Sequence, residues 1–211
     1  MYVPPHFRED QVPELHDFIR AAPLATLVSS TPAGLFASHL PLLIDPEPKP
    51  FGTLSGHLAR ANPHWKEATS GTEALAIFTG PQAYITPAWY VAKQETGKVV
   101  PTWNYAAVHA YGTLRFFEDE ASLLRLVTRL TETHEAKRAA PWAVSDAPAD
   151  FVKGMLRAIV GFELTVTRLE GKWKMSQNRP PADIERVVEG LDRDGEAAVA
   201  AVVAKRNRGR R

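Results

Sequence analysis

The sequence predicts a mainly β protein in which an antiparallel β-barrel carries peripheral helices. β-prone runs follow one another with short turns between them, which is typical of hairpins rather than of the alternating strands and helices of a parallel sheet. The chain has 211 residues, of which 45% are hydrophobic, enough for one domain with a full core. We therefore expect a barrel domain over residues 1–180, followed by C-terminal helices and a basic tail over residues 181–211.

The first elements expected are a helix and a hairpin. The helix is predicted over residues 9–22, because Glu9 and Asp10 suit its first turn, apolar residues follow at helical spacing and Pro23 closes it. A turn over residues 31–34 contains proline and glycine and separates two β-prone runs. The strands expected in this part cover residues 24–28, 35–44 and, after a proline-rich loop, 51–57.

The middle of the chain is predicted to begin with a short helix. Asn62 suits the N-cap and Pro63 the first helical position, so we expect a helix over residues 64–68, ended by Ser70 and Gly71. The elements expected next are a strand over 73–79, an extended piece over 82–85, a polar excursion over 91–98 and a strand over 102–117, which is apolar on both faces and therefore central.

Two inserted helices are expected within residues 118–160. The first begins with an acidic turn and carries an apolar stripe, and the second covers residues 149–159. A final hairpin is predicted over residues 162–175 with its turn at Gly171, because apolar and polar residues alternate before this glycine. Two short helices, over residues 181–191 and 196–205, end the chain.

The composition and the missing motifs exclude several kinds of chemistry. The chain has no cysteine, which excludes disulfides, a thiolate nucleophile and iron–sulfur clusters. It also has no Rossmann glycine fingerprint, no P-loop, no HExxH and no GxSxG. The net charge is +1, so the body of the protein has no strong field that would attract nucleic acid.

Basic residues gather at the end of the chain. The last seven residues, from Lys205 to Arg211, contain five Lys or Arg side chains. A solubilising end is the favoured interpretation, and a DNA contact is the alternative. The N-terminus lacks the basic and apolar regions of a signal peptide, and no apolar run is long enough to cross a membrane. We therefore expect a cytoplasmic protein without a membrane contact.

Candidate site residues lie in four polar and aromatic segments. They are Ser38, His39 and Leu40; Ser55, His57, Arg60 and Asn62; Thr102, Trp103 and Asn104; and Lys174, Ser176, Gln177, Asn178 and Arg179. Each group also has a structural interpretation, as core or interface side chains, a capped turn or a solvated turn. His57 and His64 are not at a one-face helical spacing and no carboxylate completes a set, so we expect no metal site.

Several ordered strings resemble those of one known family. They are Gly-His-Leu-Ala-Arg-Ala-Asn-Pro-His, Gly-Pro-Gln-Ala-Tyr-Ile-Thr-Pro-Ala-Trp-Tyr, Val-Pro-Thr-Trp-Asn-Tyr and the late Ser-Gln-Asn-Arg. The chain is similar, from Met1 to about Leu191, to the PaiB family of FMN-binding negative transcriptional regulators. The resemblance implies the FMN-binding split β-barrel of the pyridoxamine-phosphate-oxidase type, and a homodimer with FMN in the groove between subunits. Gln82 stands where this family is expected to have His.

The candidate residues can be matched to what a flavin requires. Its phosphate needs cations and hydroxyl or amide donors, and the cluster from Ser55 to Asn62 offers them, with Arg60 assigned to the phosphate by the resemblance. The ring needs an apolar wall and donors near its carbonyl groups, for which the segments at His39 and Trp103 are suited. We expect the donors of residues 174–179 to come from the second subunit.

Three functions remain open from the sequence. The first is a dimeric FMN-binding regulator, whose regulatory role comes only from the resemblance. The second is an FMN-dependent oxidoreductase of small molecules, with His39, His109 and Tyr105 as unranked acid–base candidates. The third is an interaction dimer without a cofactor. Heme is an alternative ligand, since related split barrels accept it. No catalytic residue is assigned, and a dedicated enzyme is the less favoured interpretation.

Overall fold

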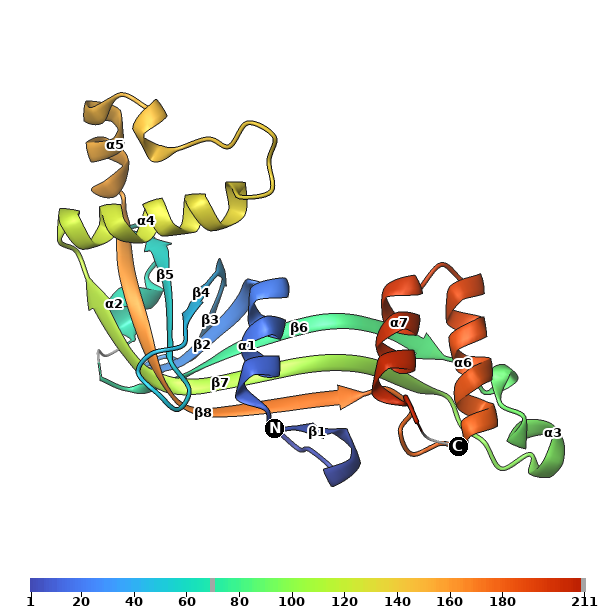
Figure 1. Ribbon diagram of the computed structural model, residues 1–211. Helices are drawn as coiled ribbons and strands as arrows, with labels where there is room; N and C mark the ends of the chain where they lie inside the picture. Colours follow the sequence, from blue (N-terminus) through green and yellow to red (C-terminus); the bar gives the residue numbers. More distant parts are fainter. Residues whose placement is uncertain (69–70, 210–211) are drawn as a thin grey trace. The chain divides into compact units, whose positions relative to one another are not determined.

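A computed structural model describes residues 1–68 and 71–209 (Figure 1). Within these residues the strands form one eight-stranded sheet in the order β3-β2-β6-β7-β8-β5-β4, with β1 paired to β8 outside this path. The pairings of β2 with β3 and β6, of β5 with β4 and β8, and of β1 with β8 are antiparallel. The predicted fold class, mainly β with peripheral helices, is therefore confirmed.

The elements have the following bounds. The strands are β1 (Arg8–Glu9), β2 (Leu24–Thr31), β3 (Gly34–Pro41), β4 (Leu43–Asp45), β5 (Thr53–Ala59), β6 (Glu73–Ile85), β7 (Thr102–Phe117) and β8 (Ile159–Lys174). The helices are α1 (Val12–Ala21), α2 (His64–Glu67), α3 (Ala92–Thr96), α4 (Glu120–Glu135), α5 (Ala149–Leu156), α6 (Pro181–Arg193) and α7 (Ala197–Arg206), with short 3₁₀ helices η1 (Pro5–Phe7), η2 (Pro87–Trp89) and η3 (Val144–Asp146).

The chain divides into two compact units. Unit 1 comprises residues 1–15, 79–108 and 170–211, and unit 2 comprises residues 16–78 and 109–169. The long strands β6, β7 and β8 contribute residues to both units. The predicted boundary at residue 180 remains a prediction, and each unit is described by itself below.

Unit 2 contains the barrel. Strands β3 and β4 stand at opposite ends of the sheet order, yet only Leu42 separates them in the sequence. Because consecutive Cα atoms are about 3.8 Å apart, the two ends of the sheet must meet at this residue, which closes the sheet on itself. The fully buried side chains inside this unit include Leu27, Leu42, Leu54, Leu58, Phe78, Leu114, Phe162 and Leu164.

A glycine lets two strands of the barrel approach closely. A Cβ atom at Gly112 of β7 would clash with the backbone carbonyl of Thr165 in β8. Only glycine fits such an approach of two backbones. Helix α4 lies across β5, β7 and β8 (Figure 1), where Leu126 and Leu130 pack with Leu43 and Phe117. This helix therefore covers part of the outer face of the barrel.

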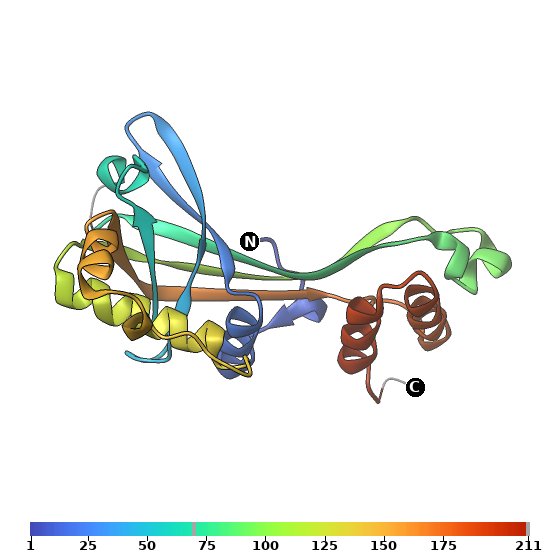
Figure 2. The same cartoon turned by 90° about the horizontal axis from the view of Figure 1, so that it is seen from above.

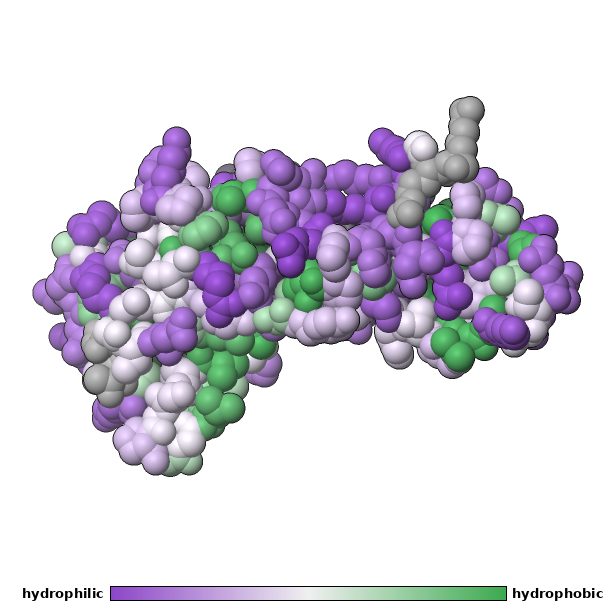
Figure 3. Space-filling model, turned by 90° about the horizontal axis from the view of Figure 1, so that it is seen from below, coloured by the Kyte–Doolittle hydropathy of each residue, from purple (hydrophilic) through white to green (hydrophobic). Residues whose placement is uncertain are grey.

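Unit 1 contains the start of β7 and the end of β8. The register of β1 on β8 pairs Arg8 with Lys172 and Glu9 with Gly171. Helices α6 and α7 lie side by side in Figures 1 and 2, with Val187 and Val203 fully buried. Figure 3 shows hydrophobic side chains as separate green areas among hydrophilic ones on one face of the molecule.

The predicted final hairpin is wrong, because β8 runs straight through Gly171 as one strand. This glycine makes room for a packing contact rather than a turn, since a Cβ atom would clash with the side chain of Leu15 and crowd the carbonyl of Glu9. The N-terminal helix also begins later than predicted. Glu9 belongs to β1, and α1 begins at Val12.

Two further element predictions are corrected. The strand expected over residues 73–79 and the extended piece after it are one strand, β6. Its pairing with β2 ends at Ile77, so the missing N–H of Pro81 costs no bond to β2. The polar excursion over residues 91–98 contains helix α3, which ends at Thr96 and is followed by Gly97 with a φ of 64°. Of the residues predicted to end the helix after His64, Ser70 lies outside the described residues.

A candidate cationic pocket

Unit 1 contains a pocket of about 230 Å³ where the start of β7 meets the end of β8 and the turn that follows it. Its lining residues are Phe7, Tyr90, Val100, Thr102, Asn104, Lys174, Ser176, Asn178 and Arg179. Six of these were predicted from the sequence as site residues, from two segments about 70 positions apart. The structure therefore brings the third and fourth predicted groups together.

Strand geometry explains which residues of the third group face the pocket. Successive side chains of a strand point to opposite faces, so Thr102 and Asn104 share the lined face. Trp103 is 52% exposed, and its ring forms an edge contact with Tyr84, with the centroids 6.3 Å apart. Trp103 therefore lies outside the pocket that Thr102 and Asn104 line, although the sequence placed all three in one group.

Two cations give the pocket its charge. Lys174 donates a hydrogen bond to Oγ1 of Thr102, and the guanidinium of Arg179 lies 4.4 Å from the ring centroid of Tyr90. Burial lowers the pKa of Lys174 below its ordinary value of 10.5, and the charges of Lys172 and Arg179 lower it further. Among the residues that the structure describes, neither Lys174 nor Arg179 forms an ion pair.

A strained turn holds the polar wall of the pocket. Ser176 has a φ of 64°, which is uncommon for a residue with a side chain. Its hydroxyl accepts a hydrogen bond of 2.9 Å from the amide of Asn104, which is 1% exposed. Gln177 also fixes the turn, because its carbonyl accepts from the Met175 N–H and its amide donates to the Trp173 carbonyl, both at 2.6 Å. Gln177 therefore shapes the turn and does not line the pocket.

Unit 2 contains a second polar cluster that is centred on His64. This side chain is completely buried, with Nε2 2.7 Å from the Ser29 hydroxyl and Nδ1 2.9 Å from the Ser38 hydroxyl. Asn62 donates from its amide to the Ser38 hydroxyl and accepts the backbone N–H of His64, both at 3.0 Å. Burial lowers the pKa of His64, although Glu67 opposes this shift. Burial within the cluster therefore favours the neutral form of this imidazole.

Sequence reasoning had not placed Ser29 and His64 among the site residues. The only signal was that His64 ends the first of the family-like strings, directly after the Asn62 cap. Pairing between β2 and β3 brings Ser29 and Ser38 to the same histidine. Ser38 pairs with Leu27, which lies two positions before Ser29 and therefore on the same face of β2. A serine contact of this kind depends on strand register, which the sequence does not show.

Arg60 is committed to structural contacts. Its Nε donates to the Arg157 carbonyl over 2.7 Å, its second terminal nitrogen donates to the Ile159 carbonyl over 3.0 Å, and the remaining nitrogen pairs with Glu118. The predicted phosphate role stays a prediction. To bind a phosphate, Arg60 would have to give up these contacts. The two bonds to backbone carbonyls connect the residue after β5 to the start of β8.

The remaining predicted residues lie elsewhere in unit 2 or at its surface. His57 is half-buried and burial lowers its pKa, while Leu40 is half-buried and Ser55 is buried. His39 is exposed and contacts the Thr26 hydroxyl at 3.0 Å. The departure from the family pattern, Gln82, is exposed and does not line the pocket of unit 1.

The acid–base candidates and the basic tail can also be located. His39, His109 and Tyr105 do not line the pocket. In the tail, Lys205 lies 3.4 Å from Glu14, and Arg206 pairs with Glu9. Arg210 and Arg211 lie outside the described residues.

The described part of the chain has neither a cluster of metal ligands nor a helix that could span a membrane. Residues 1–68 and 71–209 contain no group of three or more His, Asp or Glu side chains placed to hold a metal ion. Within the same residues, the helices are too short or too polar to cross a membrane.

A closed antiparallel barrel with peripheral helices is the fold of the split-barrel proteins. The chain belongs to the PaiB-type family of FMN-binding proteins: residues 1–168 match the family described as "Putative FMN-binding domain". The matched segment includes Thr102 and Asn104 of the pocket and ends before Lys174. The family assignment thus confirms FMN as the predicted cofactor.

Relatives extend the similarity over nearly the whole chain. The protease synthase and sporulation protein PAI 2 of Bacillus subtilis is 31% identical over 92% of this chain and 90% of its own length. A protein of Emericella nidulans is 36% identical over 98% of this chain and 97% of its own. The flavocytochrome Anf3 from Azotobacter vinelandii has a similar fold, with a TM-score of 0.57, 14% identity, and coverage of 82% of this chain and 72% of its own.

Proposed function

We propose that this protein is a homodimeric, cytoplasmic FMN-binding regulator that represses transcription, and that the pocket of unit 1 binds the phosphate end of FMN. One observation carries the location. Lys174 and Arg179 point their charges at one pocket without an ion-pair partner among the described residues. An anionic ligand would neutralise both cations where water is partly excluded.

The residues of the pocket fit a phosphate chemically. Lys174 supplies a compact charge, Arg179 supplies a planar fork of donors, and the hydroxyl of Thr102 and the side chain of Asn178 are further donors in the lining. The strained turn at Ser176 keeps these groups in place before a ligand arrives, which reduces the entropy lost on binding. When bound, FMN would supply reversible redox chemistry.

The proposed homodimer is supported by apolar surface near this pocket. Val100 lines the pocket and is 64% exposed, and the nearby Trp103 and Tyr84 are 52% and 49% exposed. Large exposed aromatic and aliphatic side chains are typical of interaction surfaces. A second copy of the chain that covered Val100 would also shield the two cations from water, whereas Trp103 and Tyr84 offer apolar surface on the other face of β7.

The regulatory role is supported by a relative. The Bacillus subtilis protein is named for protease synthesis and sporulation, and this chain is similar to it over most of both lengths. A direct DNA contact by the basic tail is the weaker part of the proposal, because Lys205 and Arg206 already pair with acidic side chains. Regulation through a partner protein is an alternative to that contact.

The proposal is tested by titrating purified protein with FMN and following flavin fluorescence, with the molar mass measured by light scattering. We expect saturable binding to a dimer, and weaker binding for Arg179→Gln. A mobility-shift assay on DNA upstream of the chain's own gene tests direct DNA binding, and a reporter gene under that DNA tests repression. NAD(P)H-dependent turnover would instead favour the oxidoreductase, and failure to take up FMN at micromolar concentration would contradict the cofactor site.

A further inference from the structure

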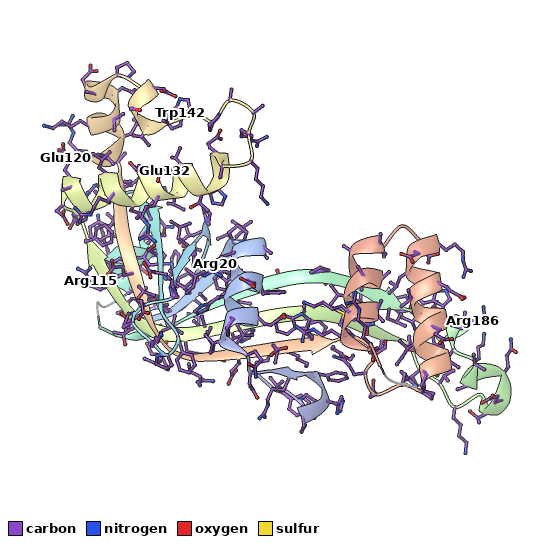
Figure 4. The ribbon with its side chains drawn as sticks, in the orientation of Figure 1. Arg20, Arg115, Glu120, Glu132, Trp142 and Arg186 are labelled. Carbon is purple, nitrogen blue, oxygen red and sulfur yellow. The ribbon has the colours of Figure 1, made fainter. Side chains whose placement is uncertain are left out.

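A second pocket, of about 190 Å³, lies in unit 2 between α4 and the outer face of the barrel. Its lining residues are Ser55, Arg115, Phe117, Ser122, Arg125, Leu126, Arg129 and Glu163. Three arginines therefore converge from two elements, Arg115 from β7 (labelled in Figure 4) and Arg125 and Arg129 from α4. Arg125 and Arg129 are four positions apart, so the helix presents both on one face.

The arginines are only partly neutralised. Arg115 pairs with Glu163 at 2.6 Å and Arg129 approaches Asp45 at 3.4 Å. Arg125 donates to the neutral hydroxyl of Ser122 at 2.7 Å, and it forms no ion pair within residues 1–68 and 71–209. The lining itself contains three arginines and one carboxylate, Glu163, while Asp45 and Asp119 act on Arg129 and Arg125 from outside the lining.

The floor of the pocket contains a buried hydroxyl that is not satisfied. Ser55 is 8% exposed, and its Oγ has no hydrogen-bond partner among the residues that the structure describes. Polar groups in protein interiors almost always have a partner, and one that lacks it calls for an explanation. Ser55 lies opposite Glu163 in the register of β5 and β8, so its hydroxyl is placed beside the arginines.

We propose that this pocket is a second anion site, which binds the phosphate group of a small phosphate monoester or free phosphate. Guanidinium groups bind phosphate oxygens through paired, planar hydrogen bonds. A phosphate dianion would use the charge of Arg125 and accept a hydrogen bond from Ser55. All lining residues of this second site belong to unit 2, and none of them lines the FMN pocket of unit 1.

The test measures the binding of inorganic phosphate by isothermal titration calorimetry at low ionic strength, with FMN-free and FMN-saturated protein. We expect Arg125→Gln to weaken phosphate binding about tenfold, as a charged hydrogen bond predicts. Ser55→Ala should weaken it about threefold or more, yet leave the melting temperature without phosphate equal or higher, because it removes an unsatisfied buried group. Arg20→Gln is the control, since Arg20 on α1 (labelled in Figure 4) pairs with Asp17 of the same helix.

Each outcome decides the proposal. Phosphate binding that is lost in Arg125→Gln, retained in Arg20→Gln and unchanged by FMN supports a separate site. Equal phosphate affinity in all variants, or no binding at millimolar phosphate, overturns it. Competition between phosphate and FMN that disappears in Arg125→Gln would also overturn it, because the pocket would then be the cofactor's own phosphate site. Measuring FMN affinity of Arg125→Gln separates this failure from failure of the site at Lys174.

Discussion

The side-chain amide of Asn104 donates a 2.9 Å hydrogen bond to the hydroxyl of Ser176, across 72 positions of sequence. This bond joins the start of β7 to the strained turn after β8, and both residues are buried. It fixes the wall beside which Lys174 and Arg179 present their charges. The shape of the candidate FMN pocket therefore depends on this contact between β7 and the turn after β8, while its charge comes from the two cations.

Replacing the lysine of this pocket tests its role in binding FMN. Lys174→Met keeps much of the apolar stem and removes the charge, so we expect the dissociation constant for FMN to rise at least about tenfold. Lys98→Gln changes an exposed lysine of the same unit and should leave the affinity unchanged. Fluorescence titration of both variants makes the comparison, and equal affinities would remove Lys174 from the site.

The same lysine should make FMN binding sensitive to alkaline pH. The pKa of Lys174 lies below 10.5 because of burial and the charges of Lys172 and Arg179. The lysine therefore loses its positive charge at a lower pH than an ordinary lysine does, and FMN affinity should fall as the pH rises toward 10.5. Lys174→Met should lack this component. Parallel pH profiles for the two proteins would contradict the assignment.

The buried imidazole of His64 should make stability sensitive to acid. Its pKa is lowered from 6.5 by burial, so below pH 6.5 the unfolded chain binds a proton that the folded protein does not. Stability therefore falls as the pH drops from 6.5 toward the lowered pKa. His57 acts in the same direction, since burial lowers its pKa as well.

A His64→Gln variant isolates this contribution. It should be less stable at pH 7.5 by about 1–3 kcal/mol, because the hydroxyls of Ser29 and Ser38 lose a buried partner. It should also lose less stability than the wild type between pH 7.5 and pH 5.5. Urea denaturation at the two pH values measures both effects. A variant with the wild-type pH dependence would show that His64 is not the titrating group.

Two glycines provide a matched test of the barrel. Gly112→Ala should destabilise the protein by about 1–3 kcal/mol, because the added methyl group meets the Thr165 backbone. Gly154→Ala should stabilise it by about 0.5–1 kcal/mol, because Gly154 lies within α5 with open space around it. Thermal unfolding of the two variants compares them, and a harmless Gly112→Ala would contradict the close approach of β7 and β8.

Arg60 should prove structural. Arg60→Ala removes donors to two backbone carbonyls and the ion pair with Glu118, so we expect a loss of about 1–3 kcal/mol in stability and little change in FMN affinity at a temperature where the variant is folded. A specific loss of FMN binding with normal stability would restore the phosphate role that the family resemblance assigns to Arg60.

Local signals located a peripheral helix and a central strand well. The acidic turn and apolar stripe before residue 135 predicted α4, and the alternating residues from Thr102 to Phe117 predicted β7. Two failures, the final hairpin and the division of β6, share one physical cause, because a glycine or proline need not break a strand. Gly171 instead accommodates Leu15, and Pro81 lies where β6 no longer pairs with β2. Such reasons depend on neighbours distant in the sequence.

The sequence by itself determined the fold class, the family and the residue types available to hold a phosphate. It could not decide which of them meet, because strand pairing joins segments that no local pattern connects. The tertiary structure placed Thr102 beside Lys174, enclosed His64 between two serines and committed Arg60 to backbone carbonyls. Burial and register, which only the folded chain has, separate the cations that are free to bind an anion from those that hold the fold together.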